Sequence, residues 1–194
     1  MIEKILDLDS YLFLFLNNLG SQYYDNFWIF LSRTEANVMF YLVVLIAYIY
    51  SINNKKRTKI LFRLIITIAI LITISDQTSN LFKDSFQRLR PCYNELISDS
   101  LRLVKDSCGG RYGFFSAHAS NSFSLAIFFG LLLRSSNKLL ILLFAIYAFL
   151  ISYSRIYLGV HYPIDIIVGI IFGTINAIVL YKIYLYSFNF LNKS

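Results

Sequence analysis

The chain has 194 residues, of which 57% are hydrophobic and only 15% are charged. A soluble domain carries about 25% charged residues, so this composition excludes a soluble domain, a disordered chain and a small disulfide-stapled secreted fold, and it leaves an integral membrane protein. The formal net charge is nevertheless +7, which could reflect nucleic-acid binding, the cytoplasmic loops of a membrane protein or a site for an anion.

Residues 1–35 are predicted to form an amphipathic segment that lies on the membrane or against a helical bundle. Acidic and amide residues interrupt a set of apolar residues at helical spacing: Ile5, Leu8, Leu12, Phe15 and Leu19. These polar residues favour an interfacial helix over a short sixth span. The acidic start and the lack of a small-residue cleavage site argue against a signal peptide. We separate this segment from residues 36–194, which we interpret as one domain.

Five apolar runs further along the chain have the length expected of membrane-spanning helices. They cover residues 37–52, 59–82, 116–133, 139–157 and 163–186. Spanning strands are excluded because the runs are long and do not alternate between apolar and polar residues. We therefore predict an all-α integral membrane bundle with about five to six transmembrane helices.

The connection 83–115 is the one long connection between these spans, and it is polar and carries both cysteines. Lys and Arg are dense in residues 53–59 and recur in the other short connections of the opposite face, which the positive-inside rule makes cytoplasmic. Cys92 and Cys108 then lie on the outer face, where disulfides persist, so we favour a bridge over two free thiols. Such a bridge would contribute about 3 kcal/mol through loop-closure entropy.

Three cations are expected at the outer ends of the spans, namely Lys83, Arg90 and Arg155. Cations at the edge of an apolar bundle need a partner, and the nearby carboxylates are too few to neutralise all three. A phosphate would do so through charge-assisted hydrogen bonds. Ser116 starts a predicted helix, whose free backbone N–H groups also favour an anion. Each cation taken alone could be an interfacial side chain, but together they indicate a site for an oxyanion.

Both histidines of the chain fall in the same outer clusters. His161 and Asp165 are four residues apart, so they share one face if the last span begins near His161. An Asp beside a His fixes its tautomer and raises the basicity of the far nitrogen, which a nucleophilic or general-base His requires. His118 lies two residues from Ser116, within reach of a leaving-group oxygen.

The pattern Lys-x6-Arg-Pro, Ser-x-His and Ser-Arg-x5-His-x3-Asp between Lys83 and Asp165 resembles the type 2 phosphatidic acid phosphatase (PAP2) superfamily. That superfamily also includes vanadium-dependent haloperoxidases and acid phosphatases. The resemblance implies that His161 is a nucleophile that forms a phosphohistidine, that Asp165 orients it and that His118 is the general acid. It also implies that no metal or other cofactor is required for phosphatase activity.

The resemblance further implies a set of phosphate ligands: Lys83, Arg90, Ser116, Ala117 and Arg155. One motif departs from the family's pattern, because Phe115-Ser116-Ala117-His118 stands where the family has Pro-Ser-Gly-His. Alanine is small and can still present its backbone N–H, and the reactive Ser and His remain. We therefore expect the activity to be kept.

Three further charged residues are candidates for smaller roles. Arg88 and Arg111 could contact a second phosphate or a sugar, although we slightly favour plain solvent exposure for both. Asp76 lies inside the second predicted span, two helical turns before Lys83. It could help to hold Lys83, but packing between helices is the favoured interpretation.

A membrane lipid that carries a phosphate is the expected substrate, because the site lies at a membrane–water boundary. The motifs look like those of small bacterial members of the superfamily, which include lipid A phosphatases and undecaprenyl-diphosphate phosphatases. Phosphatidic acid or phosphatidylglycerol phosphate is the alternative substrate. A non-catalytic phospholipid- or anion-binding protein or transporter is the alternative from another class. We expect a bacterial inner-membrane location with the site facing the periplasm, and neither a nucleic-acid partner nor a cofactor.

Overall fold

The computed structural model describes residues 2–52, 57–105, 107–134 and 137–192, with side chains from residue 3 to residue 187 within these ranges. These residues form helices and two short 3-10 turns, and no strand occurs among them. The helices are α1 (Ile2–Asn18), α2 (Asp25–Leu31), α3 (Thr34–Ser51), α4 (Arg57–Phe86), α5 (Ala117–Leu133), α6 (Leu139–Tyr157) and α7 (Pro163–Asn192). The predicted all-α fold is confirmed.

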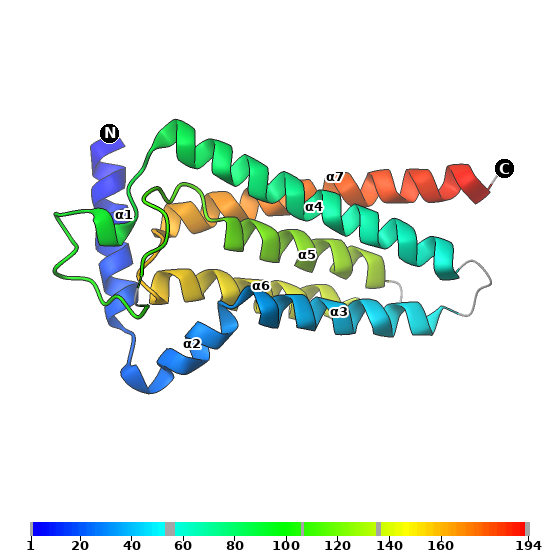
Figure 1. Cartoon of the computed structure of the whole chain (residues 1–194), viewed down its shortest axis with the longest axis horizontal. Coiled ribbons are helices and arrows are strands. Elements are labelled where there is room, and N and C mark those ends of the chain that lie inside the picture. Colours follow the sequence, from blue (N-terminus) through cyan, green and yellow to red (C-terminus); the bar gives the residue numbers. More distant parts are fainter. Residues whose placement is uncertain (1, 53–56, 106, 135–136, 193–194) are drawn as a thin grey trace.

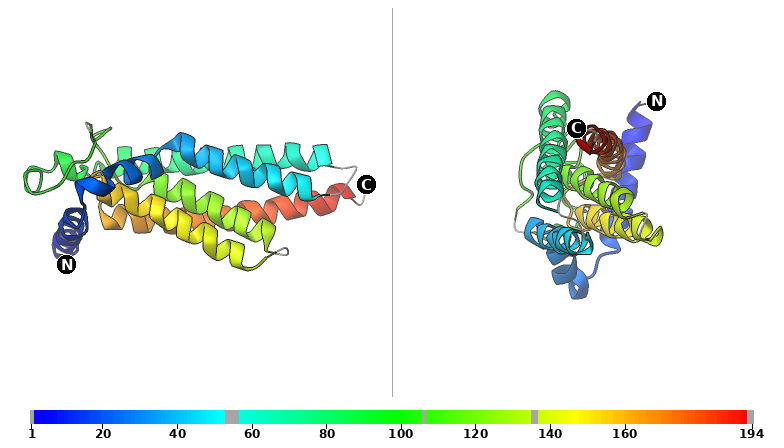
Figure 2. Two further views of the ribbon diagram at one scale, coloured as in Figure 1. Left: turned by 90° about the horizontal axis from the view of Figure 1, so that it is seen from below. Right: turned by 90° about the vertical axis from the view of Figure 1, so that its right-hand side faces the viewer.

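The five predicted spans correspond to α3–α7, which run side by side along the long axis of the molecule (Figure 1). Four of them are long and apolar enough to cross a membrane, over Thr34–Ser51, Arg57–Phe86, Leu139–Tyr157 and Pro163–Ser187. The fifth, α5, has 17 apolar-rich residues and lies in the middle of the bundle, with α3, α4, α6 and α7 packed around it (Figure 2). Because neighbouring helices surround α5, many of its side chains between Ala119 and Gly130 are buried inside the bundle.

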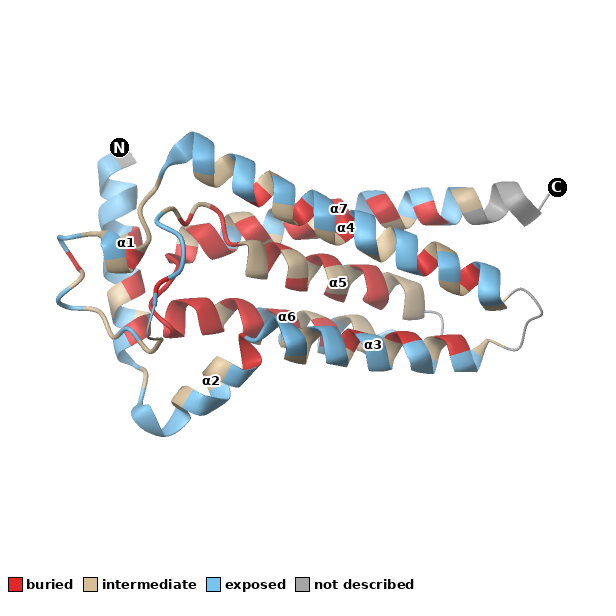
Figure 3. Ribbon diagram, in the orientation of Figure 1, coloured by how far each residue is buried: buried red, intermediate tan, exposed pale blue. Residues whose placement is uncertain are grey.

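The outward faces of the bundle are apolar, as a membrane requires. Buried residues gather on the faces of the helices that meet inside the bundle, whereas the outer faces of α3 and α4 are exposed (Figure 3). These exposed faces carry large hydrophobic side chains such as Val43, Phe62 and Ile74. In water such a surface would be unfavourable, and a lipid environment removes that cost.

The helix α1 crosses the end of the bundle rather than running along it (Figure 1). The apolar residues that define its predicted stripe, from Ile5 to Leu19, are exposed, while Asp9, Phe13 and Asn17 are buried against the rest of the protein. The Asn17 amide donates to the carbonyl of Ile156 at 3.0 Å. Two of the polar residues that interrupt the apolar pattern, Asp9 and Asn17, therefore help Phe13 to fasten α1, while the predicted apolar stripe is exposed.

Two glycines allow α7 to approach α5 closely. A Cβ atom on Gly173 would come within 2.2 Å of the Ser120 carbonyl oxygen, and one on Gly169 within 2.7 Å of the Ser116 carbonyl oxygen. Only a residue without a side chain fits at such backbone contacts. The backbone N–H of Ser116 also donates to the carbonyl of Asp165 at 3.1 Å. This packing sets the start of α5 beside the start of α7.

Candidate active site

The long connection between α4 and α5 folds over the same end of the bundle as α1 (Figure 1). Leu89 and Tyr112 form an isolated antiparallel bridge, and the Arg90 N–H donates to the Arg111 carbonyl at 3.1 Å. Cys92 and Cys108 form a disulfide with a Cα–Cα distance of 6.4 Å. The predicted bridge is thus present, and it closes the part of the connection that directly follows Arg90.

The disulfide leads to a prediction about stability and orientation. Replacing both cysteines with serine should lower the free energy of unfolding by about 3 kcal/mol, because the unfolded chain then loses its covalent constraint. Thermal melting in detergent measures this change.

In intact cells, a membrane-impermeant maleimide should label Cys92 and Cys108 only after reduction, and thiols that stay reduced and inaccessible from outside would contradict the predicted orientation.

His161 and Asp165 are brought together at the start of α7, as their spacing predicts. The Nδ1 atom of His161 lies 3.3 Å from Oδ2 of Asp165, and the backbone N–H of Tyr162 donates to the same oxygen at 3.1 Å. Both side chains are buried. Because the carboxylate holds Nδ1, the Nε2 atom is the nitrogen that remains for chemistry.

A buried ion-pair network extends from this pair to α1. The Arg88 guanidinium donates through Nη1 to Oδ1 of Asp165 at 2.8 Å and through Nη2 to Oδ2 of Asp9 at 2.6 Å. The other oxygen of Asp9 accepts from the backbone N–H of Ile164 at 2.9 Å, in the first turn of α7. Burial alone would lower the pKa of Arg88, but Asp165 and Asp9 outweigh it and raise that pKa. Arg88 therefore stays charged and forms an ion pair with Asp165, whose carboxylate in turn contacts His161.

This placement differs from both roles considered for Arg88 in the sequence. Arg88 is partly buried and its guanidinium faces two carboxylates, whereas Arg111 is exposed and meets Arg90 through its backbone carbonyl. Asp9 was not a candidate at all, because it lies 79 residues from Arg88. The one hint in the sequence is an acidic residue within the helical pattern of residues 1–35.

Lys83, Arg90 and Arg155 all lie near enough to His161 to interact with it electrostatically. Burial lowers the pKa of His161 well below the usual histidine value, and the positive charges of Arg90, Arg155 and Lys83 lower it further. A hydrogen bond with the Gly113 backbone opposes this shift only in part. His161 is therefore neutral at pH 7, the form that a nucleophile requires.

Arg155 is the most buried of these cations and has an unused donor. One of its terminal nitrogens donates to the hydroxyl of Ser32, which directly follows α2. Its Nε is buried and has no hydrogen-bond partner among the residues that the structure describes. A buried N–H without a partner is unfavourable, so this atom suits an oxyanion bound next to the histidines.

The start of α5 adds backbone donors to this group of cations. Ser116 is the N-cap residue, and its hydroxyl oxygen accepts from the Ala119 N–H at 3.4 Å. Ala117 and His118 follow in the first turn, where backbone N–H groups have no partner within the helix. The Ala117 N–H therefore lies where a helix start favours an anion.

Two further residues belong to this site, although the motifs did not indicate them. Lys105 joins the cations, since burial lowers its pKa and the charges of Arg155, Arg33 and Arg90 lower it further. Gly113 packs directly on the His161–Asp165 pair, because a Cβ atom there would lie 3.0 Å from Cγ of Arg90 and 3.6 Å from Nδ1 of His161. A cation in a loop and a lone glycine carry no spacing signal that could have revealed them.

Lowering the pH should destabilise the protein through His161. In the unfolded chain this histidine gains a proton below about pH 6.5, whereas its lowered pKa keeps it neutral in the folded protein. The unfolded state then binds more protons, so the free energy of unfolding falls as the pH drops below about 6.5. Melting in detergent across this range measures the effect. His161→Gln should lose less stability on acidification, and equal losses would contradict the account.

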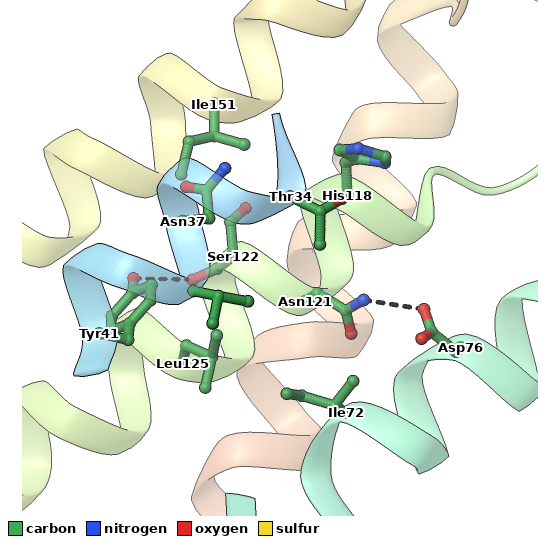
Figure 4. A pocket seen from close by; sticks show the side chains of 11 residues that line it. Thr34, Asn37, Tyr41, Ile72, Asp76, His118, Asn121, Ser122, Leu125 and Ile151 are labelled. Atoms are coloured by element: carbon green, nitrogen blue, oxygen red, sulfur yellow. Dashed lines mark hydrogen bonds between the residues drawn. The ribbon is translucent and has the colours of Figure 1, made fainter. Parts of the chain in front are cut away.

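A cavity of about 200 Å³ opens beside His118, among α3, α4, α5 and α6 (Figure 4). His118 forms part of its wall, together with polar residues of α3, α4 and α5. His118 thus lines this cavity and also interacts electrostatically with Arg155, His161, Lys105 and Arg90.

A His–Asp pair surrounded by cations is an arrangement that suits a bound phosphate. The model of the PAP2 superfamily matches residues 71–189. The chain belongs to the PAP2 superfamily. This match starts inside α4 and ends in α7, so it contains all three motifs and both histidines. The predicted superfamily is confirmed, and the protein is a membrane phosphatase of this superfamily.

Two curated relatives of this PAP2 protein carry the name lipid A 4'-phosphatase. One, from Porphyromonas gingivalis, is 35% identical over 96% of this chain and 77% of its own length. The other, from Bacteroides thetaiotaomicron, is 36% identical over 94% of this chain and 80% of its own length. Both matches extend well beyond the motifs and include most of the residues before α4.

Two solved structures resemble the PAP2 fold described above. LpxE of Aquifex aeolicus superimposes with a TM-score of 0.66 at 26% identity, over 88% of this chain and 93% of its own. A PAP2-type phosphatidylglycerolphosphate phosphatase of Bacillus subtilis gives a TM-score of 0.70 at 12% identity, over 93% of this chain and 86% of its own. The second likeness shows the fold alone.

Proposed function

We propose that this PAP2 protein removes a phosphate from lipid A through a phosphohistidine at His161. The observation that carries the chemistry is the His161–Asp165 pair, with its 3.3 Å contact, surrounded by Lys83, Arg90 and Arg155. The similarity along nearly the whole chain to two lipid A 4'-phosphatases supports lipid A over undecaprenyl diphosphate. Phosphatidic acid and phosphatidylglycerol phosphate remain the alternative substrates.

The first half-reaction transfers the phosphoryl group to the protein. The three cations and the Ala117 N–H hold the phosphate, and Nε2 of His161 attacks phosphorus. A P–N bond forms as the P–O bond to the lipid alcohol breaks, and His118 gives its proton to the departing oxygen. Asp165 stabilises the imidazole ring while it carries the phosphoryl group, and Arg88 in turn keeps Asp165 ionised.

The second half-reaction returns the protein to its starting state. Water attacks phosphorus, and neutral His118 accepts the proton of this water. The P–N bond breaks, His161 becomes neutral again and inorganic phosphate leaves. Both steps use the same cations to stabilise charge on the phosphoryl oxygens, and no other reactant enters the balance.

We also propose that the site faces the periplasm of a bacterial inner membrane. The end that carries the site also carries the disulfide, which fits an oxidising compartment. Nine of the 18 Lys and Arg residues belong to the opposite end in the sequence, with no acidic residue among them. Of the predicted basic segment 53–59, residues 53–56 lie outside the described part of the structure, as does Lys193.

The proposed substrate is tested by incubating purified protein with lipid A, undecaprenyl diphosphate, phosphatidic acid and phosphatidylglycerol phosphate in one detergent. Initial rates of phosphate release should be highest with lipid A. A protein that binds these lipids but releases no phosphate from any of them would instead support the non-catalytic binding protein or transporter.

A further inference from the structure

The cavity beside His118 has a polar wall whose chemistry differs from that of the phosphate site (Figure 4). Asp76 of α4 and Asn121 of α5 face each other in this wall, and the Asn121 Nδ2 donates to Oδ1 of Asp76 at 2.8 Å. A carboxylate can only accept, so this contact fixes which end of the amide is the nitrogen. The Oδ1 of Asn121 is buried and has no hydrogen-bond partner among the described residues.

The Asp76–Asn121 pair therefore offers hydrogen-bond acceptors, because the Asn121 Nδ2 is already used as a donor and the Asn121 Oδ1 is unpaired among the described residues. A buried acceptor without a partner is unfavourable, and a ligand that donates a hydrogen bond relieves this cost. A carboxylate within a membrane-spanning helix is also expensive, which makes Asp76 a candidate for function. Asn37, also in the wall, does not share this property, because its Oδ1 already accepts from the hydroxyl of Tyr147 at 2.9 Å.

The phosphate site and the Asp76–Asn121 pair thus favour different chemical groups of a substrate. Lys83, Arg90 and Arg155 present donors and positive charge, so they take the phosphate. Asp76 and Asn121 present acceptors, so they repel a phosphate and attract hydroxyl or amide N–H groups. His118 lines the cavity and interacts with the cations, and in the proposed mechanism it protonates the departing oxygen. The alcohol that leaves therefore faces the cavity.

We infer that Asp76 and Asn121 form a subsite for the departing alcohol, and that they select alcohols that carry hydroxyl or amide N–H donors, such as an N-acylated amino sugar. This inference rests on the proposed lipid phosphatase function and narrows its substrate class. A diacylglycerol offers no such donor next to the phosphate, and a polyprenyl phosphate presents further acceptors to the same wall.

The cavity extends into an apolar region that suits the acyl chain of such a lipid. A second cavity of about 160 Å³ shares Val38, Tyr41, Ile72 and Leu125 with the first. Its other lining residues are apolar and lie further along α3, α4 and α5 from the phosphate site: Leu42, Leu45, Ile68 and Phe129. A polar region near His118 followed by an apolar region between α3 and α4 matches the order of sugar and acyl chain in a glycolipid.

The experiment compares two substrates in the same detergent, lipid A and phosphatidic acid. Asn121→Leu removes the unpaired acceptor, and Asp76→Asn removes the negative charge. The readout is the ratio of kcat/KM for lipid A to kcat/KM for phosphatidic acid, because general losses cancel in it.

This ratio should fall about tenfold or more in each variant, since a site built to pair a donor loses that pairing. Gln77→Leu, an exposed neighbour on α4, is the matched control and should leave the ratio unchanged.

An unchanged ratio in both variants would overturn the inference, since Asp76 and Asn121 would then only join α4 to α5. A wild-type protein that hydrolyses phosphatidic acid but not lipid A would also overturn it while leaving lipid phosphatase activity intact. A wild-type protein that hydrolyses neither lipid would refute the proposed function, and this inference with it. If one variant does not accumulate as folded protein, the substrate ratio of the other variant decides whether the inference holds.

Discussion

Replacing His161 with alanine is expected to reduce kcat/KM by about 10³-fold or more with every substrate, because the nucleophile is lost. The reduction should be just as large with a phosphate ester of a good leaving group, such as p-nitrophenyl phosphate. The phosphoryl group has no other acceptor at this position, so a better leaving group does not help. Phosphate release from detergent-solubilised protein measures the effect.

His118→Ala is the matched control for this experiment. A general acid matters most when the departing oxygen is a poor leaving group, so transfer from p-nitrophenyl phosphate should be much less impaired than transfer from lipid A. Two histidines with the same dependence on the leaving group would contradict their separate roles. An unchanged rate of phosphate release in His161→Ala would contradict the claim that the protein is a phosphatase with His161 as its nucleophile.

The second large effect is expected from Arg88→Met. This change leaves the carboxylates of Asp9 and Asp165 buried without their shared partner, and removing one member of a buried ion pair typically costs about 3–5 kcal/mol of stability. Activity should fall as well, because Asp165 is then no longer kept ionised by Arg88 and no longer holds Nδ1 of the neutral His161. Thermal melting and kcat, measured on the same preparation, report both losses.

A second substitution separates this account from general damage. Arg88→Met combined with Asp9→Asn removes one of the two unpaired charges and keeps an acceptor for the Ile164 N–H, so part of the lost stability should return. Arg111→Met changes an exposed arginine of the same connection and should have little effect. Equal destabilisation by Arg88→Met and Arg111→Met would argue against the network.

The parts of the site that the sequence could predict are those with short spacings. His161 and Asp165 meet across the start of α7, because Asp165 in the first turn reaches back to the two residues that precede Pro163. Ser116 caps a helix whose start is visible in the apolar pattern. The long apolar runs likewise predicted α3–α7. In each case the physical signal lies within one helix or one turn.

The parts that the sequence could not predict depend on contacts between distant segments. The pairing of Asp9 with Arg88 spans 79 residues, and Asn121 with Asp76 spans 45. Spacing holds no information about such pairs, because they exist only once the helices have packed. The burial of Asp9 and Asn17 on α1 has the same cause, because both side chains bond to segments far along the chain, and the predicted apolar stripe is left exposed.

The central claim is that the phosphoryl group passes through His161, and trapping the intermediate tests it most directly. Lipid A labelled with radioactive phosphate is mixed with the protein and quenched in alkali, in which a phosphohistidine survives. The account predicts label on the peptide that contains His161, label that acid removes, and none on His161→Ala. Label on another residue, or label that persists in His161→Ala, would contradict it.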